Sequence, residues 1–234
     1  IDFTGGNAVT GNSTMRATLN RSGDLVTDIF LKLEVPAIAK AWKNQLGFRL
    51  IKSVSLSIGH SVVDKLYGDY MWAWEELSAT AEQKQGAAVG AAALDNAAAH
   101  VLYVHIPFWF SRNQGGTGQA LKLVALQYHA VQVTLETNSL ASLVDDAAPA
   151  EADAAGINAS LQVEYVYLDV EERAAMAAGS FETLITELQV VTGLKGAAAA
   201  THAISCPFNH ALQEIIVLQT GAGEYIPAAE ASIN

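Results

Sequence analysis

The chain has 234 residues, of which 51% are hydrophobic and 16% are charged, and its formal net charge is −11. This acidic balance argues against direct contact with nucleic acid, which needs a basic face, and it disfavours simple electrostatic adhesion to anionic lipid. The lone cysteine, Cys206, excludes an internal disulfide, and no apolar run reaches the roughly 20 residues of a membrane-spanning helix.

The first third of the chain predicts paired strands. Residues 14–20 and 25–35 form two β-prone runs that are separated by the turn cluster at residues 22–24. Apolar and polar side chains alternate along residues 25–35, which is typical of a strand with one buried face. Residues 50–58 alternate in the same way, and a turn then allows residues 61–67 to return as the second arm of a hairpin.

The remaining chain predicts a helix, more strands and long connections. Tyr70–Leu77 carries Trp72 and Trp74 and suits a short helix on a connection between strands. Further apolar, β-prone runs predict strands at residues 101–110, 123–135, 161–168 and 215–219. Three alanine-crowded stretches are expected to be long surface loops: Gly86–Ala99, Asp145–Ala159 and Lys195–Ala200. Unevenly spaced strands without sustained helix–strand alternation predict an all-β antiparallel jelly-roll sandwich, with short helices in the connections.

The patterns that usually accompany catalysis or metal binding are missing from the sequence. None of the six histidines is paired with another at the i+2 or i+4 spacing that favours a metal site. The glycine-rich residues 115–118 lack the ending of a phosphate-binding loop. The charged cluster at residues 169–173 is interpreted as a solvated turn or as the acidic first turn of a helix. We therefore expect no enzymatic activity, no cofactor and no metal.

Several motifs along the chain carry a resemblance to a known family. Residues 106–113, Ile-Pro-Phe-Trp-Phe-Ser-Arg-Asn, resemble the Pro-Phe-Trp-Phe-Cys-Arg-Asn signature of major capsid proteins of nucleocytoplasmic large DNA viruses. Residues 120–129 and 165–173 are similar to that family's Ala-Leu-Pro-Leu-Ile-Ala-Leu-Gln-Tyr-His and Tyr-Val-Tyr-Leu-Asp-Thr-Glu-Glu-Arg. Weaker matches at residues 21–26, 50–69 and 208–216 keep the same order, so the resemblance is collinear from about Arg21 to Gln219.

The sequence also departs from the family's motifs at several positions. Ser111 stands where the family has cysteine, and Lys122 stands where it has proline. Ala174 and Ala175 replace an arginine-rich step, and Phe181 replaces an expected histidine. These departures bear on local contacts and leave the order of the motifs intact.

The resemblance implies two jelly rolls in one chain, with three chains forming a trimeric capsomer of pseudo-hexagonal outline that tiles an icosahedral shell. We accordingly expect a first roll at residues 1–190, a linker at 191–207 and the incomplete start of a second roll at 208–234. The implied partners are two further copies of the chain, neighbouring capsomers and minor capsid proteins, with only indirect contact to an internal membrane. The implied location is the virion capsid, assembled in the host cytoplasm.

Five aromatic residues are candidate packing or assembly anchors, because aromatic side chains are enriched at protein interfaces: Trp72, Trp74, Phe108, Trp109 and Phe110. Phe108 and Phe110 are expected to share one face of a strand, so packing inside a single roll is an equal alternative for them. Sequons at Asn12, Asn20 and Asn158 are candidate sites for surface glycans.

Two other functions stay open at this stage. A related minor or penton capsid protein with a single jelly roll would suit the length of the chain. A carbohydrate-binding jelly-roll module would use exposed aromatic residues and loops, although the collinear capsid motifs argue against it.

Overall fold

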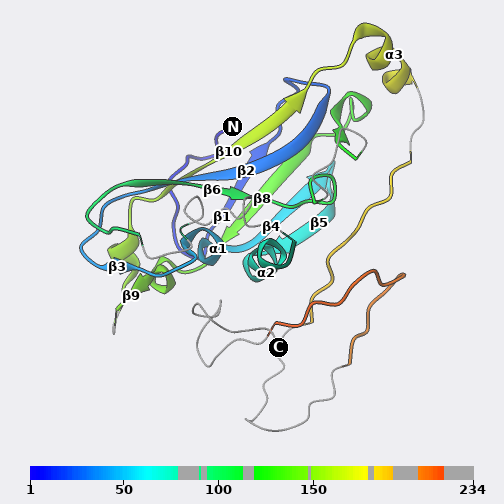
Figure 1. Ribbon diagram of the computed structural model, residues 1–234. Coiled ribbons are helices and arrows are strands. Elements are labelled where there is room, and N and C mark those ends of the chain that lie inside the picture. Colours follow the sequence, from blue (N-terminus) through cyan, green and yellow to red (C-terminus); the bar gives the residue numbers. More distant parts are fainter. Residues whose placement is uncertain are drawn as a thin grey trace.

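Two antiparallel sheets stack face to face in the computed structural model, which describes residues 1–78, 90, 94–112, 119–146, 149–178, 182–191 and 205–218. One sheet has the strand order β1-β8-β4-β5 and the other has β10-β2-β6, with the short β7 also paired to β2 (Figure 1). A two-stranded ribbon, β3-β9, lies beside them. This is the expected antiparallel sandwich.

The strands are β1 (Thr14–Thr18), β2 (Leu25–Val35), β3 (Ala41–Trp42), β4 (Ile51–Ile58), β5 (Ser61–Tyr67), β6 (His100–His105), β7 (Leu121–Lys122), β8 (Val131–Thr137), β9 (Val144–Asp145) and β10 (Asn158–Val166). The α-helices are α1 (Leu46–Leu50), α2 (Gly68–Ser78) and α3 (Val170–Ala178), and the 3-10 helices are η2 (Leu123–Ala125), η3 (Leu140–Leu143) and η4 (Glu151–Ala154).

The core lies between the two sheets and follows from the period-two alternation of the strands. Ile29, Leu31 and Leu33 of β2 face inward and are buried, while Val133 and Leu135 of β8 face them from the other sheet. Each fully buried aliphatic side chain contributes about 1.5–3 kcal/mol relative to exposure. Burial of these alternating side chains fixes the register, because a slip of one residue would turn every apolar side chain outward.

Helix α2 joins the end of β5 and lies against the α1–β4 junction (Figure 1). At its first residue, Gly68, an added Cβ would lie 2.3 Å from the carbonyl oxygens of both Phe48 and Ile51. Only glycine allows this close backbone contact. The predicted helix over Tyr70–Leu77 is therefore confirmed, and its start is set by a steric constraint.

Four sequence-based predictions need correction. The strand expected at residues 101–110 ends at His105, because Pro107 lacks an N–H group and the chain then folds into turns. The run at 123–135 begins with η2 and becomes a strand only at Val131. The alanine-rich loop expected at 145–159 contains η4 and the start of β10, because Ala154 and Ala159 fit into the core as small buried side chains.

The fourth correction concerns the C-terminal segment at residues 205–218, which contains neither helix nor strand. The described part of the strand predicted at 215–219 has no pairing partner in the described residues, and an unpaired strand is not stable by itself. Residues 115–118, Phe181 and the stretch Lys195–Ala200 lie outside the described ranges, as does most of Gly86–Ala99. The proposed boundaries of the two rolls stay predictions.

Candidate packing and assembly site

The motif at residues 106–112 leaves β6 and folds into a compact series of turns. The backbone N–H groups of Ser111 and Arg112 donate to the Phe108 carbonyl at 2.9 and 3.0 Å. The Ser111 hydroxyl donates to the carbonyl of Ile106 at 3.1 Å and is buried. Ser111 occupies the position of the family's cysteine, and its hydroxyl thus stabilises the turn through a hydrogen bond within the motif.

The three aromatic residues of this motif lie in the core of the chain. The exposed fractions of Phe108, Trp109 and Phe110 are 0, 7 and 3%. The Phe108 and Phe110 rings stack with 5.9 Å between centroids, and the Trp109 ring meets Phe110 edge-on at 5.0 Å. Their common packing arises from turns and not from strand alternation. The structure therefore places these three residues where they pack the sandwich itself.

Arg112 closes the motif and joins it to three other segments. Its Nη2 donates to Oδ2 of Asp64 on β5 at 3.2 Å, and its guanidinium lies 5.6 Å from the ring centroid of Tyr70 on α2. Its Nε donates to the Pro107 carbonyl at 2.9 Å, and its Nη1 donates to the Thr186 carbonyl at 3.2 Å. We call these contacts the Arg112 junction.

The Arg112 junction is buried, and this burial alters the acidity of Asp64. The side chains of Arg112 and Asp64 are 7 and 0% exposed. Burial raises the pKa of Asp64 to about 6, and the opposing Arg112 charge only partly offsets that rise. Asp69, at the start of α2, also has its pKa raised to about 6 by burial, with Arg49 acting in the opposite direction. Two carboxylates near α2 therefore pass through their titration range close to pH 6.

Trp72 and Trp74 lie on α2 and are half-buried, with part of each ring packed against the core. The Trp74 ring stacks on Tyr70 with 6.1 Å between centroids. These two side chains differ from the buried aromatic residues of the turn motif, because part of their surface stays accessible in the single chain.

A second motif junction lies between the start of β2 and the start of α3. Asp24 Oδ2 accepts hydrogen bonds from Arg173 Nη2 and from the Leu168 backbone N–H, each at 2.8 Å. The Arg173 hydrogen bond is the main cause that lowers the pKa of Asp24. Beside it, an added Cβ at Gly23 would come within 2.7 Å of the Cβ of Tyr165. We call these contacts the Asp24 junction.

The Asp24 junction confirms one interpretation of the charged residues 169–173. Helix α3 begins at Val170, and Glu171 and Glu172 occupy its first turn, where negative charge complements the helix dipole. Neither junction was evident from sequence spacing, because the paired residues are 48 and 149 positions apart.

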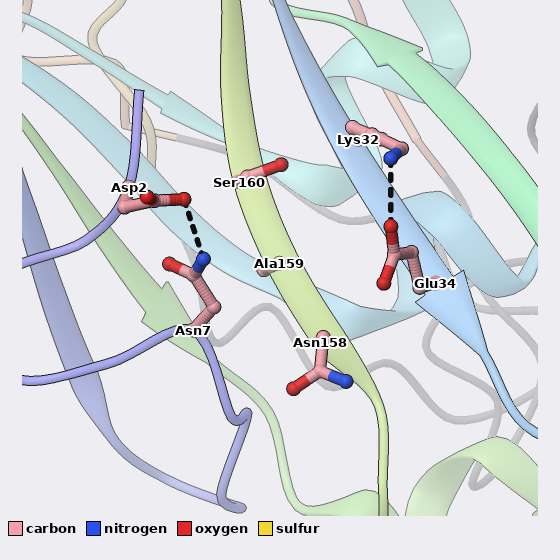
Figure 2. Close-up of a pocket in the computed structure, with 7 residues that line it drawn as sticks. All are labelled: Asp2, Asn7, Lys32, Glu34, Asn158, Ala159 and Ser160. Atoms are coloured by element: carbon pink, nitrogen blue, oxygen red, sulfur yellow. Dashed lines mark hydrogen bonds and ion pairs between the residues drawn. The ribbon is translucent and has the colours of Figure 1, made fainter.

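The three candidate glycosylation residues, Asn12, Asn20 and Asn158, are exposed. Asn158 lines a shallow polar depression on the outer side of β10 and β2, which Figure 2 shows with its other lining residues, Asp2, Asn7, Lys32, Glu34, Ala159 and Ser160. Lys32 pairs with Glu34 at 2.6 Å, and the Asn7 side chain donates to Asp2 at 2.6 Å. Four of the polar side chains that line this depression thus bind each other in two pairs.

The described part of the chain lacks two further kinds of functional feature. No group of three or more His, Cys, Asp or Glu side chains in this part of the chain is arranged to hold a metal ion. No described helix has both the length and the hydropathy to cross a membrane.

Comparisons with known proteins assign the chain to a family. Residues 2–169 match the family model "Major capsid protein N-terminus". The chain is 35% identical over 221 residues to the major capsid protein of Pyramimonas orientalis virus, covering 88% of this chain and 52% of that protein. It is 32% identical over 246 residues to capsid protein 1 of Acanthamoeba polyphaga mimivirus, covering 91% of this chain and 41% of that protein.

The fold of the chain is also similar to that of a known capsid protein. The chain is similar to a subunit of the PBCV-1 virus capsid model, with a TM-score of 0.69 and 28% identity over 81% of this chain and 46% of that chain. The chain thus spans about half, or less, of the length of these relatives. The all-β sandwich is a capsid jelly roll, and the family's role is structural and not enzymatic. The collinear motifs, the family model and the fold agree, and this chain belongs to the major capsid proteins of nucleocytoplasmic large DNA viruses.

Proposed function

We propose that the chain is the N-terminal, shell-forming part of a capsid protein that self-assembles into pseudo-hexameric trimers, which tile an icosahedral virion. The observation that carries this proposal is the match of residues 2–169 to the N-terminal domain of major capsid proteins. The similarity to a subunit of the PBCV-1 capsid supports it independently of the motifs.

The physical basis of the proposed function is association between rigid surfaces. A sandwich held by cross-strand pairing keeps its outer surfaces in a fixed relation, and closed symmetry then limits growth to one capsomer. Apolar surface that is removed from water on association contributes about 25 cal/mol per Å², and obligate interfaces often exceed about 2,000 Å². Residues at such an interface must be accessible in the single chain.

Helix α2 is our candidate for part of that interface. Trp72 and Trp74 are only half-buried on it, and Leu77, one turn further along, is 57% exposed. Tryptophan is among the residues most enriched at interface hot spots, so two tryptophans with accessible ring surface on one helix support this candidate. The proposed role of the buried aromatic residues is different: Phe108, Trp109 and Phe110 stabilise the sandwich on which α2 lies, and they do not contact a neighbouring chain.

The further partners follow from the proposed role. Neighbouring capsomers and minor capsid proteins would contact the outer faces of the capsomer, and an internal membrane would be met only indirectly. Glycans at Asn12, Asn20 or Asn158 would lie on accessible surface, since all three side chains are exposed. The proposed location is the virion capsid, with assembly in the host cytoplasm.

The experiment is electron microscopy of the purified full-length gene product that contains this chain. We expect particles with a pseudo-hexagonal outline, and a single-lobed monomer at micromolar concentration would contradict the proposal. In the variant Trp74→Ala, we expect a folded chain with a moderately lower melting temperature, because part of the ring packs against the core, and a trimer fraction that falls several-fold. Tyr128→Ala is the matched control, because this aromatic residue is 94% exposed and lies away from α2 in the sequence. Equal trimer fractions in the two variants would remove α2 from the interface.

A further inference from the structure

Residues 182–191, which we call the strap, follow α3 in the chain and run back past β5 and α2 (Figure 1). Within the described residues, two contacts attach the strap to the sandwich. The Thr186 carbonyl accepts a hydrogen bond from Arg112 Nη1 at 3.2 Å, and Leu188 is partly buried against the core. Most other strap side chains are exposed, and Leu184 is 95% exposed, while Gln189 is half-buried and accepts a hydrogen bond from the Asn209 backbone N–H. The attachment therefore depends on few groups, of which Arg112 is the charged one.

The two terminal nitrogens of Arg112 bind different partners, the strap and a fully buried carboxylate. Nη1 points to the strap at Thr186, and Nη2 points to Asp64 on β5. The charged and titratable groups that act on Asp64 are Arg112 from the turn motif, Tyr70 from α2 and Glu187 from the strap. Glu214 of the C-terminal segment acts on Tyr70, whereas Lys65 acts on Asp64 only through its backbone, since its side chain pairs with Glu136.

We propose that the strap is proton-sensitive and docks more firmly on the sandwich when Asp64 is protonated. A proton on Asp64 removes the repulsion between the Asp64 and Glu187 carboxylates. It also releases the Arg112 charge from Asp64, so that the guanidinium can act on the strap through the Thr186 carbonyl and Glu187.

The energetic coupling has a defined direction. Glu187, which the docked strap brings to the junction, raises the pKa of Asp64. By reciprocity, a strap that favours proton uptake at Asp64 must itself be favoured by that proton. Because burial brings the pKa of Asp64 to about 6, the change in docking falls between about pH 5 and pH 7.5. Glu187 is the smallest of the causes that act on the pKa of Asp64, so the change in docking is smaller than the roughly tenfold that a full pKa unit would give.

Amide hydrogen exchange of residues 183–191, corrected for the intrinsic rate at each pH, measures docking in the intact chain. We expect protection factors that are about two- to threefold higher at pH 5 than at pH 7.5. Equal protection at both pH values in the unmodified chain would overturn the proposal.

Three variants test which carboxylate makes strap docking depend on pH. Asp64→Asn imitates the protonated carboxyl, so we expect high strap protection at both pH values. Glu187→Gln removes the repelling charge and should reduce the pH response. Asp69→Asn is the matched control, because the pKa of Asp69 is also about 6 but Arg49 is the charged group that acts on it. If Asp64→Asn keeps the full pH response, or if Asp69→Asn abolishes it, the proposal is wrong.

Discussion

The Arg112 and Asp24 junctions use the same chemistry in opposite environments. Both join an arginine and an aspartate that are distant in the sequence, at 3.2 and 2.8 Å. At the Arg112 junction the arginine and aspartate side chains are 7 and 0% exposed, whereas at the Asp24 junction they are 48 and 11% exposed. Burial raises the pKa of Asp64, while hydrogen bonding lowers the pKa of Asp24.

This difference shows that an ion pair does not have one fixed effect on stability. In the buried pair, desolvation outweighs the attraction between the charges, so the pair fixes geometry more than it adds stability. In the exposed pair, solvent still reaches Arg173, so the cost of desolvation is small and screening by salt is strong. The Arg112 junction therefore orders the packing around the aromatic turn, and the Asp24 junction attaches the beginning of α3.

The largest expected effect comes from the aromatic packing next to Arg112. Trp109→Ala leaves a cavity beside Phe110, and we expect a loss of about 3–5 kcal/mol in the free energy of unfolding. Urea denaturation measures this loss, and assembly should fail with it. A normal yield of soluble trimers with unchanged stability would show that the turn does not support the fold.

Removal of the buried cation should have a comparable but smaller effect. Arg112→Met leaves Asp64 buried without its charged partner, and we expect a loss of about 3 kcal/mol, since breaking one side of a buried pair costs about 3–5 kcal/mol. The Asp64 carboxyl should also bind its proton at a higher pH in this variant. Urea denaturation at pH 5 and at pH 8 tests both points, and a loss below about 1 kcal/mol at both would contradict a buried, coupled pair.

Replacement of Asp64 and of Asp24 by asparagine should change the free energy of unfolding in opposite directions. The folded state of the chain holds a proton on Asp64 up to about pH 6, whereas a carboxyl with the ordinary value of 3.8 has lost it by then. The contribution of Asp64 to the free energy of unfolding therefore rises as the pH falls from about 6 to about 4, by up to roughly 3 kcal/mol, and is constant above that window.

Asp64→Asn should consequently raise stability at pH 7.5, by about 1–3 kcal/mol, and remove this part of the pH dependence. Asp24→Asn should lower stability at pH 7.5, because the pKa of Asp24 is lowered and its ionised form is the favoured one in the folded chain. Thermal melts of both variants at pH 5 and 7.5 compare them directly. A change of the same sign at both positions would remove the distinction between the junctions.

The smallest effect is expected at the exposed arginine. Arg173→Met should lower the melting temperature by at most about 2 °C in low salt, and the difference from the unmodified chain should shrink further in high salt. Melting curves at two ionic strengths provide the measurement. A large drop that persists in high salt would mean that this junction contributes to the core.

Patterns within single strands allowed most of the fold to be predicted. The bounds of β2 and β5 agree with the predicted ones, because one-sided burial leaves a period-two signature in the sequence. The end of β6 was missed, because an apolar run looks the same whether it continues a strand or folds into buried turns. The strand predicted at 215–219 was wrong for its described part, which pairs with no described strand, because strand formation depends on a partner that local sequence does not reveal.

The candidate site was less predictable than the fold. The sequence indicated that Phe108, Trp109 and Phe110 matter, but it left open whether they face the core or a neighbour. The partner of Arg112 could not be predicted, because Asp64 reaches it only through the hairpin β4–β5 and the sandwich that carries it. The residues of both junctions lie within the family motifs, but only the fold showed which of these motifs contact each other.

The most direct test of the proposed capsid role is the mass of the assembled protein. Native mass spectrometry of the full-length gene product that contains this chain should show a homotrimer as the dominant species at micromolar concentration. A monomer, or an open series of oligomers without a closed trimer, would contradict the proposed assembly.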